Sequence, residues 1–207
     1  MALKKSFRRK KMLSKLEDTF RSYEPSTRCW LDGDYIWTVL KEHSGMLKEP
    51  ILINIDPEHG HITGPLFKRN QVQGKKDPIL IRVKIDIMTE DGARFKHSNL
   101  LAIYLNGGSR EDATGRATRF EPVEEHEYTD EINQLLQKYV TKLSVNLVYS
   151  ELPQHPQPNV DGECPNQGMC VAYVVKAGVD LALGREVELL SSQDIKRFAS
   201  AVETLYE

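Results

Sequence analysis

Cys170 is the residue of this sequence best placed for covalent chemistry. It follows a loop that contains Gly168, and it starts an apolar segment with helical spacing. Free backbone N–H groups and the helix dipole at such a position stabilise a thiolate, and they can also bind an oxyanion. A buried structural cysteine is an equally good interpretation of this position taken alone.

A thiolate nucleophile needs a base, and the base needs a group that orients it. His97 stands at the head of an apolar strand, and Glu121 ends the next strand, between Phe120 and Pro122. A carboxylate on a neighbouring antiparallel strand can reach a histidine ring nitrogen and fix its tautomer. Taken alone, a strand-edge histidine and a surface glutamate are the commoner interpretations. The other histidines fall in polar or loop surroundings: His43, His59, His61, His126 and His155.

The elements that must position these residues follow an α+β pattern. β-branched stretches predict strands over 50–55, 78–87, 98–105, 116–121 and 144–149. The alternation within 78–87 is typical of a half-buried strand. Helical spacing predicts helices over about 33–43, 129–141, 170–183 and 192–206. Two long segments, 56–77 and the Pro-rich 152–168, are expected to be loops.

Composition describes an ordinary globular chain. Of 207 residues, 40% are hydrophobic and 28% are charged, and the net charge is −2. Three cysteines are an odd number, which indicates a reducing compartment rather than a disulfide framework. We expect neither a membrane-spanning segment nor a secretory signal, because no apolar run is long enough and the basic start lacks an apolar stretch.

The first residues are strongly basic, and no acid precedes Glu17. We expect residues 1–28 to form a basic N-terminal arm or amphipathic helix, and residues 29–207 to form the main domain. Clustered Lys and Arg side chains can bind nucleic acid by releasing counterions from phosphates. A solvated arm without a partner is the alternative. The basic residues are Lys4, Lys5, Arg8, Arg9, Lys10, Lys11 and Lys15.

A metal site is not favoured. Cys164 and Cys170, with His155, match no compact structural zinc pattern, and a fourth ligand is not evident. We therefore expect no metal and no cofactor.

The order of these residues along the chain resembles one protein family. It runs from Trp30-Leu31 through His97 and Phe120-Glu121-Pro122 to Cys170. This order resembles the superfamily of the adenovirus protease and the SUMO proteases, in which His precedes the acid and the acid precedes Cys. The details look closer to maturation proteases of large DNA viruses or virophages than to cellular enzymes. The resemblance implies a papain-like α+β fold: a central mixed or antiparallel sheet flanked by helices, with the nucleophile at a helix N-terminus.

The resemblance also implies roles for the site residues. Cys170 would be the nucleophile, His97 the base and Glu121 the group that orients the base. The chain departs from the family pattern, because Ser98 stands where Trp usually follows the histidine and Val171 stands where Gly often follows the cysteine. The oxyanion-binding glutamine of many members lies six or seven residues before the cysteine. Some viral relatives place it three before, which predicts Gln167, with Gln157 as the fallback.

The function implied by the resemblance is that of a cysteine endopeptidase cutting at Gly-Gly-like sites in viral capsid or structural precursors. It would work in the virion or the host-cell cytoplasm. One alternative is an isopeptidase acting on ubiquitin-like modifiers, and another is a non-catalytic, basic-armed packaging protein on a dead protease fold. The chain's own Asn106-Gly107-Gly108 is expected to be a hairpin turn rather than a cleavage site.

Overall fold

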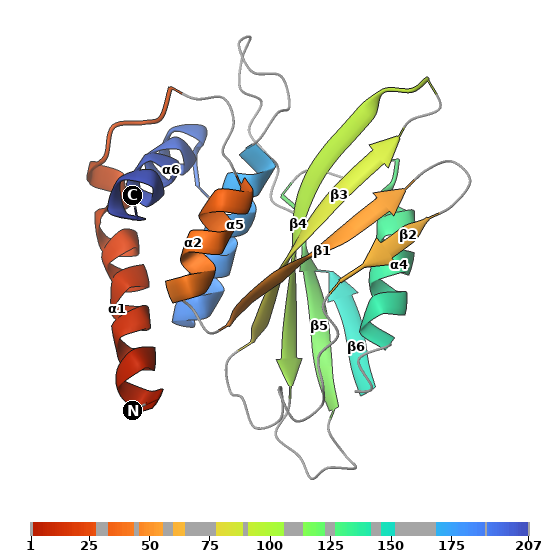
Figure 1. The fold of residues 1–207 in the computed structure, drawn as a ribbon, viewed down its shortest axis with the longest axis horizontal. Coiled ribbons are helices and arrows are strands. Elements are labelled where there is room, and N and C mark those ends of the chain that lie inside the picture. Colours follow the sequence, from red (N-terminus) through yellow and green to blue (C-terminus); the bar gives the residue numbers. More distant parts are fainter. Residues whose placement is uncertain are drawn as a thin grey trace.

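The centre of the fold is one mixed β-sheet (Figure 1). The structure is a computed structural model, which describes residues 2–27, 33–43, 46–55, 60–64, 78–88, 91–105, 114–122, 127–141, 146–151, 169–188 and 190–206. Within these residues, six strands pair in the order β2-β1-β3-β4-β5-β6. The strands are β1 (Leu47–Ile55), β2 (His61–Thr63), β3 (Ile79–Met88), β4 (Arg94–Leu105), β5 (Thr114–Phe120) and β6 (Asn146–Glu151).

Neighbouring strands run in both directions. The pairs β1/β2, β3/β4 and β4/β5 are antiparallel, whereas β1/β3 and β5/β6 are parallel. The antiparallel β4/β5 pair matters most for the site, because it joins the strand that carries His97 to the strand that ends just before Glu121.

Helices cover both faces of this sheet (Figure 1). The helical elements are α1 (Ala2–Thr19), η1 (Phe20–Ser22), α2 (Gly33–His43), α4 (Thr129–Thr141), α5 (Met169–Leu183) and α6 (Ser192–Tyr206). One core cluster joins α1, α2, α5 and α6 to sheet residues such as Leu80 and Leu100. A second cluster joins α4 to sheet residues such as Ile81 and Leu101. Adjacent strand residues point to opposite faces, so the two clusters lie on opposite sides of the sheet.

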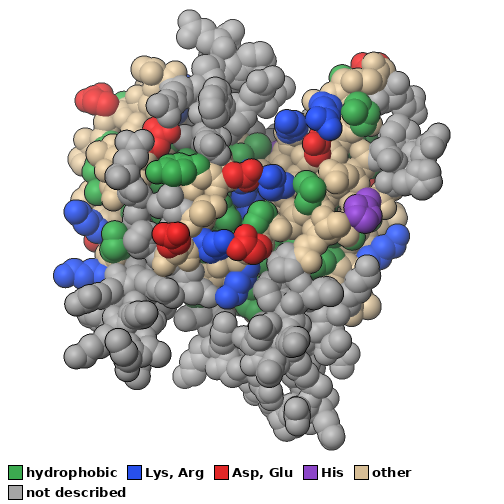
Figure 2. Space-filling view, in the orientation of Figure 1, with side chains coloured by type: hydrophobic (Ala, Val, Ile, Leu, Met, Phe, Trp, Pro, Cys, Tyr) green, Lys and Arg blue, Asp and Glu red, His purple; other side chains and the backbone are tan. Residues whose placement is uncertain are grey.

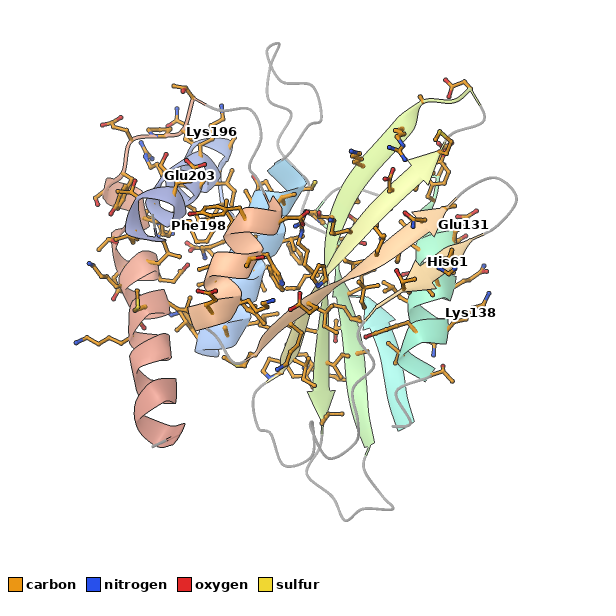
Figure 3. All side chains as sticks on the ribbon, viewed as in Figure 1. His61, Glu131, Lys138, Lys196, Phe198 and Glu203 are labelled. Carbon is orange, nitrogen blue, oxygen red and sulfur yellow. The ribbon has the colours of Figure 1, made fainter. Side chains whose placement is uncertain are left out.

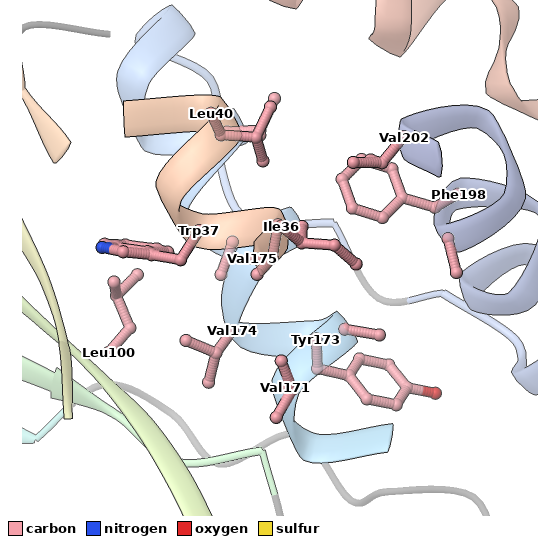
Figure 4. Close-up of a cluster of buried hydrophobic side chains, with 14 of the residues drawn as sticks. Ile36, Trp37, Leu40, Leu100, Val171, Tyr173, Val174, Val175, Phe198 and Val202 are labelled. Carbon is pink, nitrogen blue, oxygen red and sulfur yellow. The ribbon is translucent and has the colours of Figure 1, made fainter. Parts of the chain in front are cut away.

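Helix α5 lies between the sheet and the outer helices. Figure 4 shows Val174 and Val175 of α5 among Trp37 and Ile36 of α2, with Phe198 of α6 beyond. This position explains why the α5 sequence is apolar almost all round, since a helix that is covered on several sides has few positions for polar residues. The helix that carries Cys170 in its first turn is therefore packed on several sides.

The predicted elements agree with the structure in most places. The α+β class with a central mixed sheet flanked by helices is confirmed, and the helices expected over 129–141 and 192–206 have those bounds. The expectation of a half-buried strand over 78–87 is wrong for the first half of β3, where both Leu80 and Ile81 are fully buried. Helices cover both faces there. The expected Asn106-Gly107-Gly108 turn lies outside the described residues.

The helix expected near the N-terminus is present as α1. Leu13, Leu16 and Phe20 are buried in the same core cluster as α5 and α6, and Phe20 packs edge-on against Phe198 at 5.7 Å between ring centroids. The division of the chain at residue 28 stays a prediction, but the structure seats this segment against the main core. Among the described helices, none combines the length and apolar character that crossing a bilayer requires.

Candidate active site

Cys170 is the second residue of α5. The first turn of an α-helix has backbone N–H groups without intrahelical partners, and they carry the positive end of the helix dipole. Cys170 is not in a disulfide, and the residue is only 6% exposed. Only a small part of this residue is therefore accessible.

His97 and Glu121 are brought together by the antiparallel pairing of β4 with β5. Leu100 pairs with Phe120, so the chain after β5 passes close to Asn99 and His97. His97 Nε2 lies 2.5 Å from Glu121 Oε1, and both residues are almost fully buried. The carboxylate fixes the orientation of the ring, because the contact occupies one of its two nitrogens.

His97 also meets Cys170. Burial acts first on the pKa of His97 and lowers it, because a buried site disfavours the charged ring. Hydrogen bonds with Cys170 and Glu121, together with the negative charge of these two partners, outweigh that effect and raise the pKa of His97 to about 9. The ring is thus an imidazolium at neutral pH in this arrangement. An imidazolium beside a cysteine favours the reactive thiolate.

Glu121 has two further partners that sequence reasoning missed. Arg119 Nη2 donates to Glu121 Oε2 at 2.5 Å, and Asn99 Nδ2 donates to the same oxygen at 2.9 Å. The spacing of Arg119 and Glu121 could have revealed the first of these. Residues two apart in an extended chain share a face, so an arginine at that distance from a buried acid is a natural partner.

Ser98 belongs to a second polar cluster next to the helix start. Arg82 donates to Ser98 Oγ from Nη2 at 3.2 Å, and its Nη1 donates to Asp34 Oδ1 at 2.7 Å. Lys84 Nζ donates to the other oxygen of Asp34 at 2.8 Å. The position where the resembled family carries Trp is therefore occupied here by a hydroxyl that accepts from a buried guanidinium.

Gly33, the first residue of α2, lies against Val171 of α5. A Cβ atom at this position would stand 2.2 Å from Val171 Cγ1 and 2.8 Å from Arg82 Nη2. Neither distance is possible without movement of the neighbours. The glycine thus allows the first turn of α2 to lie against the first turn of α5, next to Cys170.

Several predicted participants cannot be placed. Gln167, Gln157 and Cys164 lie outside the described residues, as do Cys29 and the Trp30-Leu31 pair. The oxyanion partner therefore stays a prediction. His61, which is described, lies on the edge strand β2, across the sheet from α5 in Figure 3. Among the residues the structure covers, no group of three or more His, Cys, Asp and Glu side chains is arranged to hold a metal.

Charge is mixed on the surface that Figure 2 shows. Basic and acidic side chains alternate over the described part of this face. In the basic N-terminal segment, the side chains of Lys11 and Lys15 are described and exposed, while those of Lys4, Lys5, Arg8, Arg9 and Lys10 lie outside the description. Over the described part of the face in Figure 2, acidic and basic side chains are therefore interspersed rather than gathered into one acidic or one basic patch.

Comparison with known proteins gives distant structural likenesses. No protein-family model and no curated protein matches the chain. The SUMO protease Ulp1, with its catalytic cysteine oxidised to a sulfinic acid, is 13% identical, with a TM-score of 0.44 over 95% of this chain and 94% of that one. The Legionella pneumophila effector protein RavZ is 17% identical, with a TM-score of 0.40 over 63% of this chain and 40% of that one.

A structure of RavZ in complex with human LC3B is 13% identical, with a TM-score of 0.36 over 63% of this chain. The match spans 38% of the RavZ chain in that complex. Identities and TM-scores this low carry no functional conclusion.

Proposed function

We propose that the protein is a cysteine protease with Cys170 as nucleophile, His97 as base and Glu121 as the group that orients the base. One observation carries the proposal: a buried histidine contacts a carboxylate through Nε2 and hydrogen-bonds the only described thiol, at the start of a helix. A structural cysteine needs neither a histidine nor a carboxylate behind it.

The proposed reaction begins from a thiolate and an imidazolium. The Cys170 sulfur attacks a peptide carbonyl carbon, and as the C–N bond breaks, His97 donates its proton to the leaving amine. A water molecule then gives a proton to His97 and attacks the thioester carbonyl. The C–S bond breaks, the thiolate returns and the acid product leaves. Glu121 stabilises the imidazolium in both steps.

The tetrahedral oxyanion needs donors near the sulfur. The backbone N–H of Cys170, in the first turn of α5, is one proposed donor, and the Gln167 amide is the second, with Gln157 as the fallback. One such donor is worth about 3–4 kcal/mol of barrier lowering in a comparable hydrolase.

The proposed substrates have Gly-Gly-like sites. The low exposure of Cys170 supports this choice, because a backbone without side chains can approach a nearly buried sulfur most closely. The resemblance in residue order favours viral capsid or structural precursors as the proteins cut, and the basic N-terminal helix would hold the enzyme near nucleic acid. Exposed Lys11 and Lys15 are the described residues suited to that contact.

An isopeptidase acting on ubiquitin-like modifiers is the second candidate, because the same site performs the same chemistry on a Gly-Gly tail. A panel of Gly-Gly-tailed modifiers, assayed beside a capsid-type precursor, separates the two. Cleavage of the precursor alone supports the endopeptidase, and release of a modifier supports the isopeptidase.

A thiol probe tests the catalytic claim without knowledge of the substrate. Iodoacetamide at neutral pH should alkylate Cys170 faster than Cys29 or Cys164, as read by peptide mass spectrometry, because only an activated thiol is largely thiolate at that pH. Cys170→Ala should remove the fast phase, and Cys164→Ala is the matched control that should keep it. Equal or faster alkylation of Cys29 and Cys164 would show a non-catalytic protein on this fold.

A further inference from the structure

Arg119 is a fully buried arginine behind the candidate site. Its exposure is 1%, and its Nη2 donates to Glu121 Oε2 at 2.5 Å. Its Nη1 faces the other way and donates to Asn133 Oδ1 at 2.7 Å and to the Thr129 carbonyl at 3.4 Å. One planar guanidinium thus spans from the carboxylate to the first turns of α4.

A buried guanidinium is costly unless its charge is paired. Here the pairing is close, because Glu121 faces His97 with one oxygen and Arg119 and Asn99 with the other. A carboxylate that accepts from three donors has little freedom to rotate, and hydrogen bonds of this kind favour its ionised form.

The site residues alternate in charge. Reading outward from α5, the proposed thiolate of Cys170 meets the imidazolium of His97, then the carboxylate of Glu121, then the guanidinium of Arg119. The sum of the four charges is zero. Without the guanidinium, the same buried group would hold one net negative charge, which would oppose formation of a thiolate.

We propose that Arg119 is a positioning residue for the proposed reaction: it clamps Glu121 between His97 and the start of α4, and it balances the charge of the site. This inference rests on the function proposed above. Arg119 touches no reacting atom and acts through Glu121.

Paired variants separate the two parts of this role. Arg119→Lys keeps a positive charge but loses the planar fork, and Arg119→Met loses both. Arg116→Met is the matched control, because it removes an arginine from the same strand that is exposed and lies over the Tyr104 ring. Far-UV circular dichroism on the full chain shows whether each variant is folded.

The first readout is the pH profile of Cys170 alkylation. Loss of a nearby positive charge strengthens proton binding by every group left in the network. Arg119→Met should therefore move the acid limb, the pH range over which the alkylation rate rises, about one pH unit higher. Arg119→Lys and Arg116→Met should leave the limb where the unmodified protein has it. A purely structural role for Arg119 would not move it.

The second readout is the downfield proton NMR signal of the His97 ring, which reports its hydrogen bond to Glu121. The signal should be lost in Arg119→Met, weakened in Arg119→Lys and intact in Arg116→Met, with Glu121→Gln as the reference for complete loss. If Arg119→Met does not fold, Asn133→Ala removes the shorter of the two outer hydrogen bonds, leaves the long contact with the Thr129 carbonyl, and should weaken the signal.

Two results would overturn the inference. One is a folded Arg119→Met protein in which both the His97 proton signal and the acid limb of Cys170 alkylation are unchanged. The other is an Asn133→Ala protein with an unchanged His97 proton signal. These results differ from failure of the proposed function. In that case the unmodified protein itself would show no preferential alkylation of Cys170.

Discussion

His97 is held between two partners that both favour its charged form. Cys170 and Glu121 both interact with the ring, and the carboxylate is fixed in turn by Arg119 and Asn99. Burial alone would favour a neutral ring. The arrangement therefore gives a proton to a residue that would lose it near pH 6.5 in a free chain.

The raised pKa of His97 predicts the basic limb of reactivity. Cleavage, which needs the His97 proton for the leaving amine, should decline as pH rises through about 9, where His97 loses that proton. Glu121→Gln removes a group that raises this pKa, so the limb should move to lower pH, and turnover should fall by about 10²–10⁴-fold. A pH–rate series on both proteins measures this, and an unmoved limb would contradict the assignment.

The same pKa has a consequence for stability. Because the folded value lies above the unfolded value of 6.5, the contribution of His97 is fully present below pH 6.5 and is lost as pH rises through about 9. The free energy of unfolding measured in urea should be lower at pH 9.5 than at pH 6. In His97→Gln, the difference between the two pH values should be smaller.

Sequence order could indicate His97, Glu121 and Cys170 at the residue scale, but not Arg119 or Asn99. Residue type and order along the chain point to the three that resemble a known constellation. The two-residue spacing places Arg119 on the same face as Glu121, but this spacing marks a partner only once Glu121 is known to be buried. Asn99 depends on the cross-strand position that the pairing of Leu100 with Phe120 creates.

At the scale of elements, the first turns of α2 and α5 meet at Gly33. No side chain fits between the two helices there, and the same contact includes Val171 and the guanidinium of Arg82. Arg82 bridges this junction to β4 through Ser98 and to α2 through Asp34. Any Cβ at Gly33 would thus overlap Val171, the residue next to Cys170.

Gly33→Ala should lower both stability and alkylation of Cys170. The added methyl overlaps Val171 and forces the first turn of α5 to shift, at a cost of roughly 1–3 kcal/mol. Gly60→Ala is the matched control, since a Cβ there would meet Leu135 at 3.7 Å, an ordinary contact. Thermal unfolding and the alkylation rate measure the two effects. Equal behaviour of the two variants would argue against close packing at Gly33.

The long elements could be predicted from the sequence, whereas the short strand β2 and the true start of strand β4 could not. The helix over 129–141 follows from apolar residues at helical spacing, so its bounds agree with α4. The expectation of a loop over 56–77 is wrong at strand β2 (His61–Thr63), because three residues at a sheet edge are too few to show a strand pattern in the sequence. Strand β4 begins at Arg94 rather than at residue 98, because pairing with β3 carries it through polar residues.

At the scale of the whole molecule, the first and last helices pack together beside α5. Phe20 meets Phe198 of α6, and Glu17 Oε2 lies 3.2 Å from Lys176 Nζ on α5, where Lys176 also donates to Asp180 at 2.7 Å. These are buried side chains. The N-terminal helix thus packs against α5, the helix that carries Cys170 in its first turn.

Phe20→Ala tests whether this segment stabilises the main domain. Truncation of a fully buried aromatic ring should lower the free energy of unfolding by roughly 3–5 kcal/mol. Met12→Ala, at an exposed position of α1, should change it by less than about 0.5 kcal/mol. Urea denaturation of both variants decides. An unchanged midpoint for Phe20→Ala would mean that residues 1–28 are an independent arm.

The strands that bring His97 and Glu121 together precede Cys170 in the chain. During synthesis, the ladder between β4 and β5 can form while α5 is still inside the ribosome. The thiol is then the last of the three groups to arrive, and it gains its partner only when α5 docks on the sheet. On the proposed mechanism, a nascent chain has its base and acid ready but cannot cut anything, which protects neighbouring polypeptides until folding is complete.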